Sequence, residues 1–409
     1  MVSTPRNRGM TVVVAVVCCL GVVAPVSVAQ PRDVGNPCVG TVERPANGTT
    51  VVSVQGYNES GKQPAMLVGV GPRGAIRWVH HSAVEHDVVW SYDVDPMANG
   101  NVFVTAAVRG GKTLVYEFDP TTQETVWSVE FDIRDTHDAD LIDGGSAIVV
   151  ANMRNADPAN GTNDDRIFVY NRTRGEITWE WRFADHYSPA VGGNFSKDWT
   201  HVNDVDAIGN GTFLVSPRNF DQVIAVDRAT GEITTKLGED GNHDVLRKQH
   251  NPDYLESENG TATLLVADSE NDRVVEYTRR GDGWTRTWTV GSPETLHWPR
   301  DADRLDDGNT LVSDTKNQRV VEVTPTGEVV WEFYAPWLVY DAARLRTGEH
   351  GGPTIADMNA TGTYEMTGSA GLHGDTDRLA ACHARLMAVD GLTEAGRDAL
   401  GGNGSAGRT

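Results

Sequence analysis

Short runs of alternating apolar and polar residues, rich in valine, isoleucine and threonine, recur along the chain between turns that contain Asn-Gly or Asp-Gly. The segments "DVDAIGNGTFLVSP" and "DADRLDDGNTLVSD" are two examples. This pattern predicts β-hairpins in which glycine takes the positive φ angle of the turn. The first glycines of the turns are Gly48, Gly100, Gly144, Gly211, Gly260 and Gly308.

A second turn follows roughly twenty residues later in most units and leads into a strand that contains tryptophan. Each unit therefore reads as four antiparallel strands, and six units fill residues 41–334. Repetition of four-stranded units predicts an all-β fold, a six-bladed β-propeller. A β-helix would need a shorter repeat. A seventh blade stays open as an alternative if the C-terminal residues add strands.

The N-terminal residues predict export. Arg6 and Arg8 precede an apolar run that ends at Ala29, so residues 1–29 are expected to be a signal peptide or an N-terminal membrane anchor. Residues 30–40 are expected to be a linker. The predicted location is therefore extracellular or at the cell surface.

Residues 335–409 form a predicted C-terminal extension, in which the repeat pattern fades. Helical spacing of apolar residues between residues 375 and 389 predicts that the extension is partly helical, and its last residues are expected to be disordered.

Cys38 and Cys382 lie on opposite sides of the repeats. In an oxidising compartment they can pair and tie the two ends together.

The charge is one-sided, with 35 basic and 57 acidic residues, a net charge of −22 and only six lysines. Nucleic-acid binding needs a basic face, so this balance argues against it. An acidic surface that is poor in lysine is typical of a halophilic protein, whose self-repulsion is screened by salt. An ordinary acidic secreted protein is the alternative.

Aspartates recur just before the Asn/Asp-Gly hairpins, where the chain enters the innermost strand of each blade. Their recurrence indicates a structural role, as acceptors for backbone amides in tight loops. A metal or substrate role is the alternative. These aspartates are Asp93, Asp204, Asp253 and Asp301, with Asp95, Asp206 and Asp303 two residues further on.

Histidines break this repeat. His201 and His250 each lie nine residues before a turn asparagine, His137 enters the third blade in a similar way, and His297 opens the sixth. Each alone would be read as a hydrogen-bonded structural residue. Because loops that enter inner strands meet at one end of a propeller, together they predict a shared pocket.

The stretch "WTHVNDVDAIGNGTFLVSPRN" adds polar residues on both sides of one hairpin. His201 and Asn203 stand at its start, and Arg218 and Asn219 lie just past its end. The pattern alone leaves open whether the two sides share one end of the blade. A salt bridge to one of the many acidic residues is the alternative role for Arg218.

The segments "HDADLIDGG", "WTHVNDVDAIGNGTFLVSPRN" and "QHNPDYL" together resemble the motif series of the bacterial and archaeal arylsulfate sulfotransferases. Members of that family are six-bladed propellers with an HD, an H-x-N-S followed by a strand ending in S-R, and a QH. The resemblance, to a halophilic archaeal type, covers residues 93–334. The serine of H-x-N-S is replaced here by Asp204.

The resemblance implies that His250 is the nucleophile and that His137, His201 and Arg218 bind the sulfuryl group. Asn203, Asn219 and His297 are expected to contact the substrate. A neutral imidazole can attack sulfur to give a sulfohistidine, arginine offers a fork to the oxyanion, and a second histidine can move the proton.

The implied partners are an aryl sulfate donor and a phenol acceptor, with no cofactor and no metal. Two other hypotheses remain. A noncatalytic binding propeller of the NHL type is favoured by "VADSENDRVVEY" and "VSDTKNQRVVEV". A metal-dependent lyase or hydrolase could use the histidines and aspartates as ligands.

The charge yields the first testable prediction. Lowering the salt to tens of millimolar should lower the melting temperature, because carboxylate repulsion is then screened less. A salt series followed by circular dichroism measures this. An unchanged or higher melting temperature at low salt would contradict the halophilic interpretation.

Overall fold

The structure is a computed structural model that describes Met1 and residues 35–58, 61–193, 195–345 and 351–401. The predicted signal peptide or anchor lies outside the described residues apart from Met1, and so does the predicted disordered end from residue 402 onwards. Among the described residues, no helix combines the length and apolar character needed to cross a membrane.

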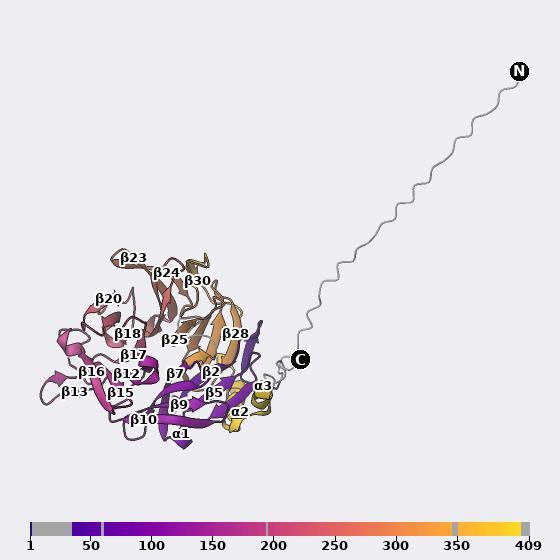
Figure 1. Cartoon of the computed structure of the whole chain (residues 1–409). Coiled ribbons are helices and arrows are strands. Elements are labelled where there is room, and N and C mark those ends of the chain that lie inside the picture. The colour runs from indigo at the N-terminus through magenta and orange to yellow at the C-terminus, as the bar shows by residue number, and fades with distance from the viewer. Residues whose placement is uncertain (2–34, 59–60, 194, 346–350, 402–409) are drawn as a thin grey trace. The chain divides into compact units, whose positions relative to one another are not determined.

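The described residues form the predicted six-bladed β-propeller, in which three blades have four strands and three have an added fifth strand (Figure 1). The strands of each blade are given from the channel outwards. The first blade contains β29 (Leu338–Arg344), β2 (Thr50–Gln55), β5 (Met66–Val70) and β6 (Ile76–His80), and the second contains β7 (Val88–Pro96), β8 (Val102–Val108), β9 (Lys112–Asp119) and β10 (Glu124–Phe131). The third contains β11 (Ala139–Ile142), β12 (Ala147–Asn152), β15 (Arg166–Asn171) and β16 (Glu176–Arg182).

The other three blades follow the same order without interruption. The fourth blade contains β17 (Val202–Ala207), β18 (Thr212–Pro217), β19 (Gln222–Asp227) and β20 (Ile233–Gly238), and the fifth contains β21 (His250–Glu256), β22 (Ala262–Asp268), β23 (Arg273–Arg280) and β24 (Gly283–Val290). The sixth contains β25 (Pro299–Arg304), β26 (Thr310–Asp314), β27 (Arg319–Val323) and β28 (Val329–Tyr334).

The two ends of the repeat region close the ring differently from the sequence prediction. β29 is the innermost strand of the first blade and pairs with β2, so the propeller continues past residue 334. β1 (Val39–Val42) is not the first strand of that blade but pairs with β28 of the sixth. The repeat pattern misses both pairings because they join residues far apart in the sequence, where no hairpin turn marks the partner.

A disulfide between Cys38 and Cys382 joins the start of the repeat region to the C-terminal extension, as predicted. Cys382 lies on α2 (Thr376–Met387), the predicted helix, whose first turn is capped by Asp375. The extension also contributes α3 (Glu394–Gly401), which the sequence pattern did not predict, and the outer strands β30 (Gly362–Tyr364) and β31 (Gly391–Leu392).

The recurring aspartates join the inner strands of neighbouring blades. A carboxylate on one inner strand accepts a hydrogen bond from a backbone N–H on the inner strand of the next blade. Of the aspartates named from the sequence, Asp253 and Asp301 make such bonds, so both have a structural role, although it joins blades and does not cap a tight loop. The donor and acceptor pairs are Val94–Asp341 (2.7 Å), Val205–Asp138 (2.5 Å), Ala207–Asp140 (2.9 Å), Arg304–Asp253 (3.3 Å) and Ala342–Asp301 (3.4 Å).

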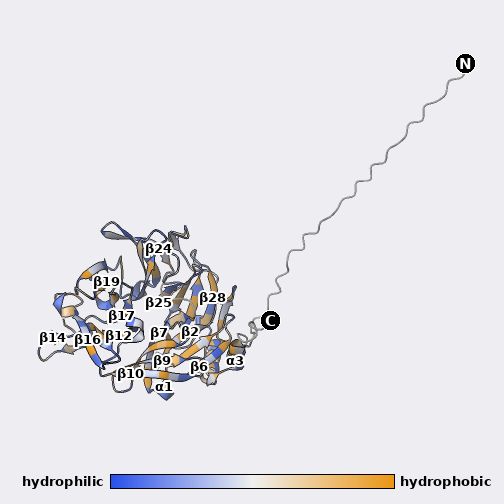
Figure 2. Cartoon of the chain, in the orientation of Figure 1, coloured by the Kyte–Doolittle hydropathy of each residue, from blue (hydrophilic) through white to orange (hydrophobic). Residues whose placement is uncertain are grey.

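The hydrophobic core lies between the blades, and apolar residues are concentrated along the strands (Figure 2). Tryptophans of the fourth strands reach across to the next blade. The indole N–H of Trp181 donates to the Gly231 carbonyl and that of Trp288 to the Pro325 carbonyl, both at 2.8 Å. Each blade is thus packed and hydrogen-bonded to its neighbour, which holds the channel residues in place.

Candidate active site

The hairpin of β17 and β18 answers the question that the sequence left open. Val202 pairs with Pro217, so His201, which precedes β17, and Arg218, which follows β18, lie at the same end of the blade. Arg218 begins a short 3-10 turn, and the backbone N–H of Asn219 donates to the Thr200 carbonyl at 2.9 Å. This bond fastens the turn against the loop that carries His201.

A cavity of about 590 Å³ lies at this end of the channel, and all six blades contribute to its wall. His137, His201, Arg218, His250 and His297 all line it, as expected for a shared pocket. The other residues of the wall are Gln55, Trp90, Tyr92, Arg154, Trp298, Arg300, Lys316, Gln318, Trp337 and Leu338.

His250 is held by its Nδ1 atom. This nitrogen lies 3.1 Å from the Lys248 carbonyl oxygen and 2.8 Å from the Ser269 hydroxyl. Because a carbonyl can only accept, the neutral ring that satisfies this contact carries its proton on Nδ1. The lone pair then resides on Nε2. His250 is 1% exposed, so this imidazole is shielded from bulk water.

His201 is oriented in a similar way by a carboxylate. Its Nδ1 lies 2.8 Å from Asp198 Oδ2, and Asp198 also accepts from Arg154 Nε at 2.9 Å. Burial lowers the pKa of His201 to about 4, although the hydrogen bond with Asp198 opposes that shift. Burial would raise the pKa of Asp198, but the hydrogen bond and charge of His201 hold it below its usual range. His201 is therefore a neutral imidazole that is hydrogen-bonded to the ionised carboxylate of Asp198.

His137 packs in an aromatic environment beside His201. Its ring lies 4.1 Å from the ring of Tyr92 and 5.1 Å from that of His201, measured between centroids. The hydroxyl of Tyr340 is 3.3 Å from its Nδ1. Tyr92 is itself hydrogen-bonded to Asp135. These contacts fix the ring edge-on to His201.

The pKa values of His137 and His250 are lowered well below the usual range. Burial is the main cause for both rings. For His137 the nearby His201 and then Arg300 add to the shift, and for His250 the guanidinium groups of Arg218 and Arg300 do so. Both imidazoles are therefore neutral at pH 7, the form that can act as a nucleophile or base.

Asn203 and Asn219 are absent from the wall of the cavity. The Nδ2 of Asn203 donates to the Gln249 carbonyl at 3.0 Å, directly before His250. Asn219 donates to the Asp198 carbonyl and accepts from Lys248 Nζ at 3.1 Å. Their described contacts fasten the loops that carry the histidines. Their predicted contact with substrate stays a prediction.

Sequence reasoning missed three cations of the cavity wall, Arg154, Arg300 and Lys316. Arg300 lies 4.0 Å from the Trp298 ring centroid and donates to Gln55 Oε1 at 2.7 Å, while Lys316 Nζ lies 4.7 Å from the same ring centroid. No carboxylate is among the described residues that line the cavity, although the chain is strongly acidic. The cavity is therefore suited to an anionic, aromatic ligand.

A sequence signal for part of this wall exists in the repeat. The residue directly before the aspartate of each inner strand lines the cavity in three blades, as Tyr92, His137 and Arg300. The pairing of the inner strand with its neighbour is irregular here in several blades, for example between Pro299 and Asp301. Such bulges re-aim side chains.

The backbone is strained at the cavity. His201, Trp298 and Trp337 have φ angles of 43°, 58° and 86°, a region that bulky residues rarely occupy. Strain of this kind persists only where surrounding contacts enforce it, and it is concentrated at functional sites. All three residues line the cavity.

Two groups of side chains among the described residues could hold a metal ion. Asp138, Asp204 and Asp206 are buried in the channel, but Asp138 already accepts the Val205 N–H. This group therefore belongs to the hydrogen bonds between blades. The other group, His80, Glu85 and His86, is separate from the cavity wall.

A family model described as arylsulfotransferase (ASST) matches residues 42–248, which is just over half of the chain. This chain belongs to the arylsulfotransferase family. The matched residues include His137, His201 and Arg218, and the match ends two residues before His250. Membership supports arylsulfotransferase activity, with aryl sulfate donors and phenol acceptors as the general substrate classes. It does not favour the noncatalytic alternative.

Solved structures show similarity in fold. A protein of unknown function from Bacteroides caccae aligns over 73% of this chain and 100% of its own, with 13% identity and a TM-score of 0.51. Virginiamycin B lyase from Staphylococcus aureus aligns over 60% of this arylsulfotransferase-family chain and 70% of its own, with 13% identity and a TM-score of 0.38. The similarity to the Bacteroides caccae protein supports the fold alone. The similarity to the lyase is too weak to support a conclusion. No curated protein matches the chain.

The lowered pKa values predict how the histidines titrate. At pH 5 an imidazole with an ordinary pKa would be about 97% protonated. His250 and His137 should instead stay neutral, which ¹⁵N chemical shifts of labelled histidines can measure, with His250→Ala assigning one signal. Because the unfolded chain then binds protons that the folded chain does not, the free energy of unfolding should fall as pH drops below about 6.5. Titration of His250 or His137 near pH 6.5 would contradict this.

Proposed function

We propose that this member of the family moves a sulfuryl group from an aryl sulfate to a phenol through a sulfohistidine at His250. The observation that carries the proposal is the buried, neutral His250, held by Nδ1 in a cavity that contains Arg218 and no described carboxylate. An anionic sulfate ester can enter such a cavity without charge repulsion, and the nucleophile that it meets has a free lone pair.

In the first half-reaction, the lone pair on His250 Nε2 attacks the sulfur of the aryl sulfate. A nitrogen–sulfur bond forms as the bond from sulfur to the phenolic oxygen breaks, and that oxygen leaves with the bonding electrons. Arg218 stabilises the charge on the sulfuryl oxygens, since guanidinium presents a rigid fork of donors. The Nδ1–H of His250 keeps its bond to the Lys248 carbonyl, which stabilises the charge that develops on the ring.

In the second half-reaction, a phenol takes the place of the departed one. His201 accepts the phenolic proton at Nε2 while its Nδ1–H remains bonded to Asp198, whose charge stabilises the imidazolium that forms. The phenolic oxygen attacks sulfur, and the nitrogen–sulfur bond breaks, which returns His250 to its starting form. His201, whose pKa is about 4, then releases this proton to solvent and returns to its neutral form.

The aromatic side chains of the wall account for the preference for phenols in this proposal. Trp90 and Trp337 provide apolar ring surface against which a phenol can pack. Arg300 and Lys316 lie on Trp298 and add positive charge near the bound ring. A phenolate is also a good leaving group in both directions, which suits a reversible transfer.

We propose further that the enzyme is exported and works in salt. The apolar leader predicted for residues 1–29 supports export, and so does the disulfide between Cys38 and Cys382, a bond typical of oxidising compartments. The net charge of −22 and the scarcity of lysine support a halophilic origin.

His250→Ala should abolish sulfuryl transfer because no nucleophile remains. Nitrophenol release from its sulfate ester, measured with added phenol in high salt, tests this. The wild type incubated with the ester alone should gain one sulfuryl mass on the peptide that contains His250, at neutral or basic pH. His186→Ala is the matched control, because His186 is exposed and lies outside the cavity wall. Full activity of His250→Ala would disprove the mechanism.

Arg218→Lys should lower kcat by roughly 100- to 1,000-fold, the usual cost of removing one transition-state donor. An ammonium keeps the charge but cannot hold two sulfuryl oxygens in a fixed geometry. Steady-state kinetics with a nitrophenyl sulfate measure the effect, and Arg228→Lys, on an exposed ion pair with Asp143, serves as the control. If Arg218→Lys retains wild-type kcat, Arg218 does not bind the reacting group.

A further inference from the structure

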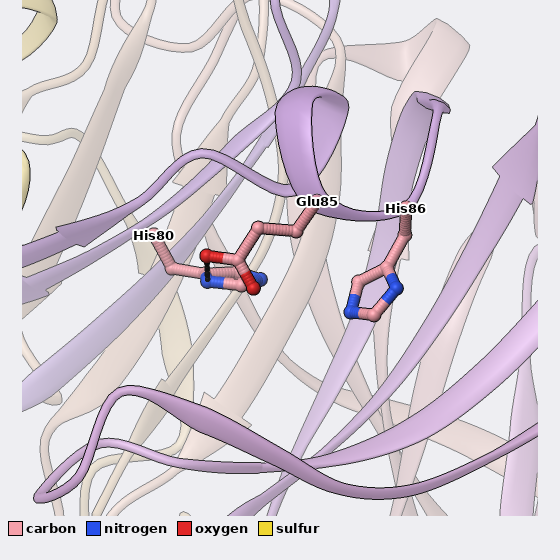
Figure 3. Close-up of side chains that lie close together, drawn as sticks. All are labelled: His80, Glu85 and His86. Carbon is pink, nitrogen blue, oxygen red and sulfur yellow. Dashed lines mark ion pairs between the residues drawn. The ribbon is translucent and has the colours of Figure 1, made fainter.

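A second cluster of chemically active side chains lies on the first blade. His80 ends β6, and Glu85 ends α1 (Ser82–Glu85), the short helix that follows, with His86 directly after it. The three side chains point toward one another between the helix and the strands beneath it (Figure 3). None of them lines the cavity that contains His250. The proposed sulfuryl transfer does not use them.

The distances fit a small cation. One ligand atom from each of His80, Glu85 and His86 lies within 4.8 Å of the other two. His80 Nδ1 is 3.4 Å from Glu85 Oε1. His86 Nε2 is 2.7 Å from the hydroxyl of Thr125 on β10, so the second blade supports this ring. The end of β6, which carries His80, and the end of α1, which carries Glu85 and precedes His86, therefore bring two imidazoles and a carboxylate together.

His80 is a buried polar side chain, and one of its two ring nitrogens makes no hydrogen bond within the described residues. Its side chain is 1% exposed, and its ring packs at 4.3 Å from the ring of Phe118. Among the described residues, its Nε2 has no hydrogen-bond partner. A buried nitrogen without a partner is costly, and a bound ligand removes that cost.

The cluster can be reached from solvent on one side. A metal ion binds the lone pair of a neutral imidazole, which both histidines can offer. Glu85 is half exposed, which leaves the cluster open to ions from solvent.

We propose that His80, Glu85 and His86 bind one divalent transition-metal ion of the zinc type. Two nitrogen ligands and one oxygen ligand suit zinc and its neighbours, whereas calcium and magnesium prefer oxygen alone. Water completes the coordination. The ion ties α1 to β6 and, through His86 and Thr125, to the second blade. It leaves the chemistry at His250 unchanged.

The experiment uses the full exported chain without a histidine tag, freed of metal by a chelator and then dialysed. ZnCl₂ is titrated in by calorimetry, and CoCl₂ is titrated separately because its visible absorption reports coordination. The wild type should bind one zinc ion and show a higher melting temperature with zinc. Glu85→Gln and His86→Gln, which remove one ligand each at partly exposed positions, should bind at least tenfold more weakly.

His81→Gln is the matched control. His81 is adjacent to His80 in sequence, but its Nε2 contacts the Val389 carbonyl at 2.8 Å and is not part of the cluster. This variant should bind zinc as the wild type does. If the wild type binds no stoichiometric zinc, or if Glu85→Gln and His86→Gln bind it with wild-type affinity, the proposal is wrong. Sulfuryl transfer, assayed in parallel, reports separately on His250.

Discussion

The hydrogen bonds from backbone N–H groups to the aspartates of the inner strands are the constraint on which the rest of this structure depends. Inner strands of adjacent blades are too divergent to pair as a sheet, so their facing amides need other acceptors. Asp341 supplies one for Val94, and Asp253 supplies one for Arg304. The arrangement places carboxylates close together around the channel. Burial, followed by Asp303 and Asp341, raises the pKa of Asp301 well above its usual value.

The same strands that carry these bonds also present the cavity residues. His137 precedes Asp138 and Arg300 precedes Asp301, so the bond that positions each strand also positions the cavity side chain beside it. His250 and His201 stand at the strand entrances, where Lys248 and Asp198 orient their rings.

The fold could be predicted from the sequence because each hairpin is local and repeats its turn signal. β29 could not, since its partner β2 is distant and no turn connects them. In the site, the histidines were visible because they interrupt a repeat. Arg300 could not be recognised from the sequence, because an arginine beside an aspartate suggests an ordinary ion pair. Asn219 neighbours Arg218 in sequence but is absent from the cavity wall, because the turn after β18 sends successive side chains in different directions.

The pairing of β29 with β2 has a consequence for how this chain is made. The first blade receives its channel strand from Leu338–Arg344, so the ring cannot close until that segment has been made. The blades in between can form their local hairpins as they emerge, but the cavity, which needs Trp337 and Leu338, is complete only afterwards. A chain truncated before residue 337 would therefore lack a formed reaction site, although five of its blades could still form their local hairpins.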